Sequence, residues 1–573
     1  MIAPGLQLKT ILEISFASLR DAVLDIADAA TPQQYRLIDC VQFTKHHNLC
    51  ICEAPDLTGV TYSAISYVWR GNPADAHWLA QERFGTFAVK GAEDGDPISI
   101  DVLLHACQAS VQHKAPYLWL DRVCILQTSR ADKRWQIQHM HQIYQQCDPC
   151  FVLPGGVRRL VRIDEETAWI QRAWTLQEAV APDYVRVLLA WPHGTGWLFG
   201  KAHGDVDAVV RGVSAVFDLA DLLRTYLGGA PGVGGETHFT TEDDAPGDRV
   251  LVRPGLFGAL ADASHVVALL GVMDVRDGDA VAHAVWRSAL LRTSSRPVDM
   301  VFSIMGLFGV SLDPHAFSAG DRLGATVALA QAITSNGGGA SWLNATAMLP
   351  PSREISTFPQ FPLTRVEGKA LVVVDGVAVE VAKVIRDEFL ANWSLKEGIS
   401  RASMDNDGYL TFSSKAIRVI PASAEDAASL NLSRSSSDAA DSHSDDDSDE
   451  TSPGLTSLTN SRCHYHAGER VFLNAVDQTI WESVSGPSRT EEPAHDEHIS
   501  RSETYAVYTG MALAHPWASR PLFLETHTMR AMLVKEHAPG RFHRASTFIL
   551  CPCFEKYIRA WDERTFAVGG PGM

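Results

Sequence analysis

Apolar and polar positions between residues 34 and 200 follow two different periods. Some segments are continuously apolar, β-branched or aromatic, as in strands that are covered on both faces. Others repeat apolar residues at helical spacing. Alternation of the two predicts a parallel sheet with helices packed on its faces. The predicted strands are 61–69, 117–120, 150–153 and 184–191, and the predicted helices are 97–114, 129–147 and 165–180.

Polar residues mark where these helices begin. Ser129 followed by Asp132 resembles a capping box, with Asp in the place where Glu is preferred. Asp164 is a candidate cap for the helix that ends before Pro182. Apolar residues also recur at helical spacing over 8–29, which predicts an amphipathic N-terminal helix rather than a secretory signal.

Beyond residue 200 the pattern divides the chain further. Residues 257–340 are mainly helical in pattern, and strands dominate from about 366 onward. A Ser/Asp-rich tract has almost no apolar content and is predicted to be disordered; Ser444 and Ser448 are phosphorylation candidates there if it is more than a passive linker. The predicted organisation is an N-terminal helix at 1–33, an α/β domain at 34–200, a helical extension at 201–345, a β-rich region at 346–425, the disordered acidic tract at 426–462 and a β-rich C-terminal region at 463–573.

Length and charge narrow the class of protein. A chain of 573 residues exceeds one ordinary core, so several structural units are expected. The net charge of −19 argues against nucleic acid as the main partner. No uninterrupted apolar run reaches the ~18 residues that a membrane span needs. Without a span or an export signal, we expect a cytoplasmic protein with reduced thiols.

The cysteines include three close pairs, and one of them has the spacing of a zinc knuckle. Cys147 and Cys150 flank Asp-Pro, but a structural zinc site usually needs a second pair at matching spacing, and none stands nearby. Buried thiols without a metal are therefore the prediction. The other pairs are Cys50/Cys52 and Cys551/Cys553.

Three segments in a fixed order resemble the heterokaryon incompatibility (HET) domain of filamentous fungi. They are YSAISYVWRG at 62–71, LWLDRVCILQ at 118–127 continuing to Ile-Tyr at 144, and RAWTLQE at 172–178. The resemblance covers about 35–190. It departs from the family pattern at Arg70, which is inserted between Trp69 and Gly71, and at Leu126, which replaces an Asn.

The resemblance implies a role in non-self recognition and regulated programmed cell death. HET domains are also remotely similar to Toll/interleukin-1 receptor (TIR) domains, which have a flavodoxin-like parallel sheet. Some TIR domains cleave NAD with a glutamate, and the segment from Trp174 to Glu178 lies over that pattern, with Thr175 in place of Cys. The similarity therefore implies an NAD hydrolase with Glu178 as the catalytic carboxylate, NAD as substrate and no cofactor.

Glycosidic cleavage passes through an oxocarbenium-like state that a nearby carboxylate stabilises. In doubly wound sheets, ligands bind beyond the carboxyl ends of the strands. Residues at such ends or beside Glu178 are the candidate substrate-binding residues: Asp121, Arg70, Trp69, Trp174 and Arg172. The indole of Trp174 would stack on a base, and Arg172 would reach a phosphate.

Structural interpretations stay open beside these. Glu178 could pair with Arg172 or another arginine, and Asp121 could only bond loop amides. Gln127 is expected to satisfy backbone groups, and Arg70 could be an exposed charge. Trp119, Trp169 and Trp174 could be core residues.

The alternative function is a non-enzymatic module that signals by self-association as a homo-oligomer or with an unknown protein partner. The segment SRPVDMVFSIMGLFGV at 295–310 resembles one found downstream of HET motifs. Asp299 and Arg296 are predicted to dock it onto the core.

Overall fold

The computed structural model describes residues 8–200, 203–228, 236–241, 249–258, 263–276, 278–364, 368–374, 376–385, 392–422, 471–473, 479–484, 503–515, 527–550 and 554–570. The predicted disordered tract at 426–462 lies outside these residues. The chain divides into two compact units. Unit 1 comprises Met1–Asp274, Leu291–Ala325 and Leu363–Leu371, and unit 2 comprises Val275–Leu290, Thr326–Pro362 and Val372–Met573.

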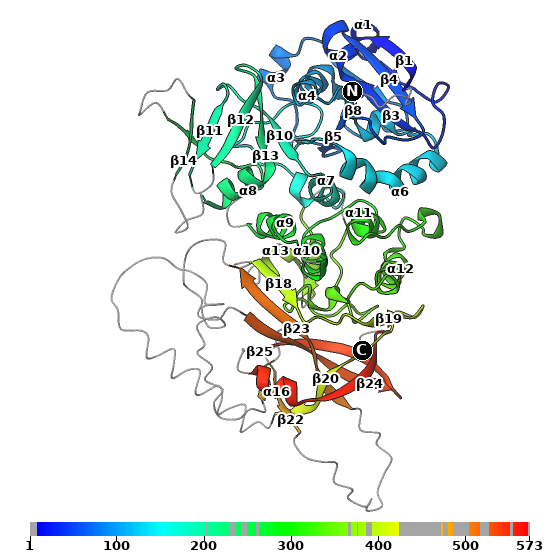
Figure 1. The fold of residues 1–573 in the computed structure, drawn as a ribbon, viewed down its shortest axis with the longest axis vertical. Coiled ribbons are helices and arrows are strands. Elements are labelled where there is room, and N and C mark those ends of the chain that lie inside the picture. Colours follow the sequence, from blue (N-terminus) through cyan, green and yellow to red (C-terminus); the bar gives the residue numbers. More distant parts are fainter. Residues whose placement is uncertain are drawn as a thin grey trace, which may run out of the picture. The chain divides into compact units, whose positions relative to one another are not determined.

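Unit 1 is built on one twelve-stranded sheet with a parallel centre. Its spatial order is β1-β4-β3-β8-β5-β9-β10-β13-β12-β11-β14-β15 (Figure 1). The strands β8, β5, β9 and β10 pair in parallel, and the strands outside them pair antiparallel. Their bounds are β1 (Lys9–Ser15), β3 (Tyr35–Asp39), β4 (Asn48–Ala54), β5 (Tyr62–Tyr67), β8 (Tyr117–Trp119), β9 (Cys150–Leu153), β10 (Val185–Ala190), β11 (Gly196–Phe199), β12 (His203–Val210), β13 (Ser214–Asp218), β14 (Thr237–Thr240) and β15 (Val250–Val252).

Helices and a small second sheet complete unit 1. The small sheet has the order β2-β6-β7, with β2 (Val23–Leu24), β6 (Thr86–Val89) and β7 (Ile98–Ser99). The helical elements are α1 (Phe16–Leu19), α2 (Cys40–His46), α3 (Ala76–Gln81), α4 (Ile100–Gln112), α5 (Asp121–Cys124), α6 (Arg130–Gln146), η1 (Trp169–Gln171), α7 (Thr175–Val180), α8 (Leu219–Gly228), α9 (Ser264–Asp274), α11 (Asp299–Met305), η3 (Gly306–Phe308) and η4 (Pro314–Ala316). None of the helices in the described part of the chain is long and apolar enough to cross a membrane.

The central strands form the core, as their apolar pattern predicts. Every residue of β5 and β9 is buried. Successive side chains of β5 point to opposite faces of the sheet. Ser63 therefore bonds to Ser110 of α4 (2.6 Å), whereas the Tyr62 hydroxyl donates to the Ile143 carbonyl of α6 (2.7 Å). Helices α4 and α6 thus cover opposite faces, as expected for a doubly wound arrangement.

The helix predicted at the N-terminus is wrong for the described residues 8–33. Strand β1 occupies Lys9–Ser15 and pairs antiparallel with β4, with Glu13 opposite Cys50. Only the short helix α1 follows it. The segment contains Ile11 and Ile14, β-branched residues that suit a strand, and pairing with β4 outweighs the helical spacing.

The boundary predicted at residue 200 is also wrong. Strands β12 to β15 continue the same sheet to Val252, so the beginning of the predicted helical extension is β-rich (Figure 1). Helices predominate only from α9 onward. The sheet continues because β13 pairs antiparallel with β10, the last strand of the parallel centre. Leu188 of β10 lies opposite Val216 of β13.

The helix predicted at 165–180 is interrupted. Its residues form only η1 and α7, and Arg172 between them has extended backbone (φ −82°, ψ 139°). The backbone there pairs with a distant segment: Ala173 N–H donates to the Thr293 carbonyl (2.9 Å), and Thr293 N–H donates to that of Gln171 (2.8 Å). Asp164 does not cap a helix; it is exposed and bonds to Arg162. By contrast, Ser129 caps α6 by accepting from Asp132 N–H (3.2 Å), as predicted.

Unit 2 combines helical segments with a nine-stranded sheet, in agreement with the β-rich prediction for its C-terminal part. Strands β23, β24, β25, β26 and β20 close into a ring, because β20 pairs with both β26 and β23. Buried apolar residues of this unit, such as Trp481, Phe548 and Trp561, form one cluster with side chains of β24 and β25. The strands are β18 (Asn392–Lys396), β19 (Ala402–Met404), β20 (Leu410–Pro421), β21 (Val471–Leu473), β22 (Ile480–Ser483), β23 (Thr504–His515), β24 (His527–Ala538), β25 (Arg541–Leu550) and β26 (Asp562–Val568).

The remaining elements near or within unit 2 are short strands and helices. They are α10 (Gly278–Leu290), α12 (Arg322–Ser335), η5 (Ser341–Asn344), β16 (Leu371–Val374), β17 (Val377–Glu380), α13 (Val381–Val384) and α16 (Glu555–Ala560). Trp286, Trp342 and Phe358 pack together here, and Trp342 stacks on Phe358 with ring centroids 5.2 Å apart.

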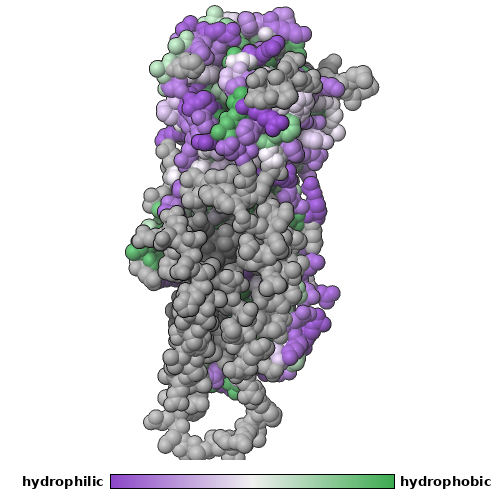
Figure 2. All heavy atoms as spheres, turned by 90° about the vertical axis from the view of Figure 1, so that its left-hand side faces the viewer, coloured by the Kyte–Doolittle hydropathy of each residue, from purple (hydrophilic) through white to green (hydrophobic). Residues whose placement is uncertain are grey.

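The described surface of unit 1 carries scattered apolar residues rather than only polar ones. In Figure 2 the coloured residues in the upper part of the view are mainly hydrophilic, with apolar side chains among them. The antiparallel part of the unit includes exposed Phe199, Val213 and Leu251. Single exposed apolar residues are normal for a folded protein, so they indicate no function by themselves.

Candidate functional site

The order of the four parallel strands places a switch point at β5. Along the chain they come as β5, β8, β9 and β10, but in space β5 lies between β8 and β9. The chain therefore winds away from β5 in one direction and then in the other. Crevices for ligands form at such points, beyond the carboxyl ends of the strands. The last residues of β5 are Ser66 and Tyr67, and each bonds to a carboxylate.

Glu178 is the carboxylate that faces Ser66. The Ser66 hydroxyl donates to Glu178 Oε2 (2.6 Å), and the indole N–H of Trp169 donates to the same hydroxyl oxygen (2.8 Å). Glu178 is only 8% exposed, and Trp169 is completely buried. Helix α7 carries Glu178 and packs against β5. Trp169 is thus a core residue, as the structural interpretation predicted, and it also orients the partner of the carboxylate.

Burial raises the pKa of Glu178 to about 8. The hydrogen bond from Ser66 opposes this shift, the negative charge of Asp121 adds to it, and Arg172 and Arg292 oppose it. Arg292 is 1% exposed, and burial lowers its pKa to about 9. Its guanidinium donates to the Arg172 carbonyl (2.9 Å) and to the Thr175 hydroxyl (2.8 Å). At neutral pH the carboxyl is therefore protonated in most molecules.

Asp121 meets the end of β5 through Tyr67. The Tyr67 hydroxyl donates to Asp121 Oδ1 (2.6 Å), which also accepts from Arg122 N–H (2.6 Å). Burial raises the pKa of Asp121, and the bond from Tyr67 opposes the rise. Since Ser66 and Tyr67 are neighbours on a strand, their side chains point to opposite faces. The two carboxylates thus flank the end of β5, close enough for Asp121 to raise the pKa of Glu178.

Gln127 and Trp119 behave as the structural interpretations predicted. The side-chain amide of Gln127 donates to the Asp121 carbonyl (3.0 Å), so it satisfies a backbone group in the loop. Trp119 is completely buried and packs edge-on against Tyr144, with ring centroids 5.5 Å apart.

Trp69 and Arg70 lie on the loop after β5 and bond to one acidic loop. Trp69 is half-buried, and its indole N–H donates to Asp94 Oδ1 (3.2 Å). Arg70 is exposed and donates to the Asp94 carbonyl (2.9 Å). The guanidinium of Arg122, completely buried, lies 5.1 Å from the ring of Trp69. Trp69 and Arg70, both predicted to bind substrate, thus lie beside the cluster around the end of β5, but their hydrogen bonds hold the loop that contains Asp94.

Gly71 closes the same loop against the loop that follows β9. A Cβ at Gly71 would lie 1.9 Å from the carbonyl oxygen of Gly155, so only glycine allows these two backbones to approach so closely. The glycine that ends the first motif therefore brings the carboxyl ends of β5 and β9 together.

Arg172 and Trp174 face a different partner. Burial raises the pKa of Asp299, and a hydrogen bond with the Trp174 side chain and the charges of Arg296 and Arg172 oppose the rise. Asp299 begins α11, which contacts α7. The prediction that Asp299 docks the downstream segment is thus supported, and Trp174 is engaged by this contact.

Ser66, Tyr67 and Arg292 were missed by sequence reasoning. The first two belong to the first motif, where a polar pair at the end of a buried strand was the available signal. Arg292 lies more than a hundred residues from Glu178 in sequence and carries no motif, so only the fold reveals it.

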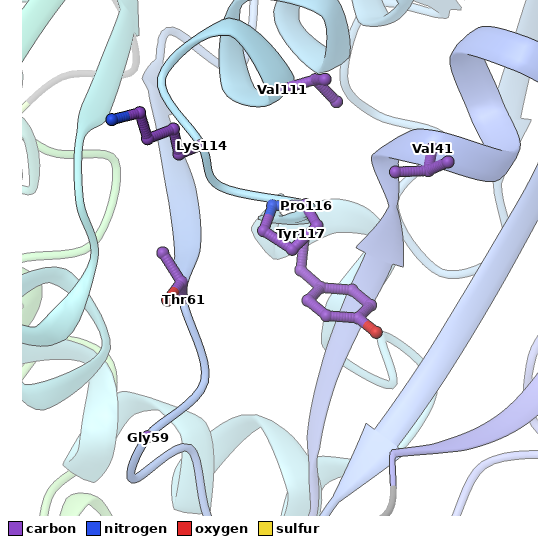
Figure 3. A pocket seen from close by; sticks show the side chains of 7 residues that line it. All are labelled: Val41, Gly59, Thr61, Val111, Lys114, Pro116 and Tyr117. Carbon is purple, nitrogen blue, oxygen red and sulfur yellow. The ribbon is translucent and has the colours of Figure 1, made fainter. Parts of the chain in front are cut away.

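A small pocket lies at the opposite edge of the same strands. Its volume is 210 Å³, and it is lined by Val41, Gly59, Thr61, Val111, Lys114, Pro116 and Tyr117. Figure 3 shows the side chains of this set around the opening, near the amino ends of β5 and β8. This pocket is therefore separate from the cluster around Glu178.

Comparison with known proteins gives one match. Residues 62–159 match the family model described as heterokaryon incompatibility protein (HET). The match includes the first two motifs and stops before the third. No curated protein and no solved structure matches the chain. The matched region contains β5, β8 and β9, the strands at the switch point. Residues 62–159 therefore belong to a heterokaryon incompatibility (HET) domain.

Proposed function

We propose that this protein is an incompatibility effector whose HET domain hydrolyses NAD and so triggers regulated cell death. One observation carries the proposal: the three motifs supply one polar cluster at the switch point of the sheet. Ser66 and Tyr67 come from the first, Asp121 from the second and Glu178 from the third. The spatial order of the parallel strands is second, first, third, fourth, the order with which a flavodoxin-like sheet begins. This supports the TIR-like interpretation.

The proposed reaction uses Glu178 in its ionised form. Water adds to C1′ of the nicotinamide ribose, the bond from C1′ to the nicotinamide nitrogen breaks, and the products are nicotinamide, ADP-ribose and a proton. The ionised carboxylate stabilises the positive charge that develops at C1′. Because the resting pKa is about 8, only a minority of molecules are in this form at pH 7. Ser66 positions the carboxylate, and the charge of Asp121 acts on it from beside the end of β5.

The test is release of nicotinamide from NAD by the purified full chain. Glu178→Gln keeps the bond to Ser66 but cannot ionise, and it is expected to lower release at least ~100-fold. The control is Glu166→Gln, an exposed carboxylate in the same unit, which should leave release unchanged. Release by the wild type should rise about tenfold per pH unit well below pH 8 and level off above pH 8, because the ionised fraction of Glu178 changes in that way.

A second candidate function, a non-enzymatic signalling module, is favoured by the 8% exposure of Glu178. It is also favoured by the series of hydrogen bonds from Trp169 to Ser66 and from Ser66 to Glu178. In that case the motifs hold the fold, and the domain signals by self-association with a second copy or a protein partner. Equal nicotinamide release from the wild type and Glu178→Gln, or no release from either, would exclude the enzymatic proposal and favour the signalling module. The Glu178→Gln variant would then still cause cell death in the host fungus.

A further inference from the structure

Cys50 and Cys52 share one face of strand β4 with a carboxylate beside them. Side chains two residues apart on a strand point the same way, so both thiols lie on one side of β4. Asp39, at the end of the neighbouring strand β3, completes the group. Its carboxylate oxygen and the two sulfur atoms all lie within 4.8 Å of one another. Both cysteines are buried, and Asp39 is half-buried.

Asp39 is held in place by backbone groups. Its Oδ1 accepts from Val41 N–H and Gln42 N–H (2.9 Å each), which caps helix α2. Both bonds end on one oxygen, which leaves Oδ2 for another ligand. Metal-binding carboxylates are commonly fixed in this way by a second set of hydrogen bonds.

Thr10 of strand β1 lies against both thiols. Its hydroxyl oxygen is 3.8 Å from the sulfur of Cys52 and 3.8 Å from that of Cys50. Thr10 is exposed, so the group adjoins solvent on this side. In the proposed site, water from this side would supply the fourth ligand.

The donor set suits a borderline-soft divalent cation. Zinc binds thiolate sulfur at about 2.3 Å and carboxylate oxygen at about 2.0 Å, so tetrahedral ligand atoms lie roughly 3.5 to 3.8 Å apart. The present spacing reaches that geometry if the donor atoms approach by about 1 Å. We propose that Asp39, Cys50 and Cys52 form a Zn²⁺ site with water as the fourth ligand. The site links β3 and the start of α2 to β4, and binding releases the protons of the two thiols.

The pair with zinc-knuckle spacing is the natural comparison. Cys147 donates to the Tyr144 carbonyl (3.1 Å). Among the residues that the structure describes, the Asp39 group alone brings three such donors together. The pair Cys50 and Cys52 with Asp39, rather than the pair Cys147 and Cys150, is thus the candidate metal site.

The test uses the full chain, reduced and treated with a chelator, and titrated with Co²⁺ as an optical probe for Zn²⁺. Thiolate ligation gives a charge-transfer band in the near ultraviolet, which should saturate at one equivalent and disappear when Zn²⁺ is added. Cys50→Ser should abolish the band, and Asp39→Asn should weaken Co²⁺ binding at least ~10-fold, as loss of a ligand does. Cys147→Ser is the matched control and should bind as the wild type.

Asp39→Asn guards against a folding artefact, because Asn caps a helix as well as Asp does. Its thermal unfolding should match that of the wild type without metal. Absence of the band in the wild type, or binding by Asp39→Asn and Cys50→Ser equal to that of the wild type, would overturn the proposal. If Cys50→Ser does not fold, the Asp39→Asn measurement decides alone.

Discussion

Glu178 shows how surroundings decide the chemistry of a single residue. The sequence places a glutamate at the end of a HET motif, but burial against β5 raises its pKa to about 8 from an ordinary value of 4.5. Between pH 4.5 and pH 8 the Glu178 carboxyl keeps its proton in the folded protein, whereas the same carboxyl has already lost its proton in the unfolded chain. The free energy of unfolding therefore decreases as pH rises through this window.

This effect can be isolated with Glu178→Gln, which resembles the protonated carboxyl and does not titrate. Between pH 5 and pH 8 the wild type should lose a few kcal/mol of unfolding free energy relative to the variant, at about 1.4 kcal/mol for each unit of pKa shift. Urea unfolding of both proteins at several pH values measures the difference, and other titrating groups cancel in it. Parallel pH profiles would contradict the burial of a protonated carboxyl.

At the scale of elements, a buried ion pair joins α6 to β3. Arg36 of β3 and Asp132 of α6 are both completely buried, with Nη1 and Oδ2 3.0 Å apart. Arg36 also lies 3.3 Å from Glu53 of β4. Asp132 further accepts from Leu126 N–H (2.9 Å) and Gln33 N–H (2.7 Å). The helix start is therefore attached to the sheet and to two loops at once.

Removing the cation should be costly, because two carboxylates would then be buried without it. We expect Arg36→Met to lower the free energy of unfolding by about 3–5 kcal/mol, the usual effect of breaking a buried pair. The double variant Arg36→Met/Asp132→Leu should recover part of this loss. Arg162→Met, which breaks an exposed pair with Asp164, should cost less than about 1 kcal/mol. Chemical denaturation checks all three, and a small loss in Arg36→Met would contradict the argument.

At the scale of the whole molecule, the Ser/Asp-rich tract is inserted in the sequence of unit 2 between β20, which ends at Pro421, and β21, which begins at Val471. Its composition cannot supply an apolar core. Deletion of residues 426–462 should therefore change the free energy of unfolding by less than about 1 kcal/mol, the range expected when a loop is shortened.

Thermal unfolding of the deletion variant tests this, with Trp561→Ala as a comparison that removes a buried residue of the apolar cluster of unit 2. That substitution should cost about 3–5 kcal/mol. A comparable loss on deletion would mean that the tract is part of the folded structure.

Much of the α/β centre was predictable. The strands at 61–69, 117–120, 150–153 and 184–191 and the helices at 97–114 and 129–147 are present, because continuous apolar runs and capped apolar stripes are local signals. The N-terminal helix, the unbroken helix at 165–180 and the boundary at 200 were wrong for one shared reason. In each place a distant strand or segment takes the backbone hydrogen bonds: β4 for residues 9–15, Thr293 for the break near Arg172, and β13 for the extension of the sheet.

The candidate site divides in the same way. The sequence alone determined the HET motifs, the cap at Ser129, and the acidic residues Asp121 and Glu178 as candidate functional groups. Each of these can be recognised from a short contiguous stretch of sequence. The tertiary structure decided that Ser66 and Tyr67 receive those two carboxylates, that Arg292 lies beside one of them, and that Asp39 meets Cys50 and Cys52. Protonation and ligand geometry depend on burial and on partners far apart along the chain, and no local pattern carries that information.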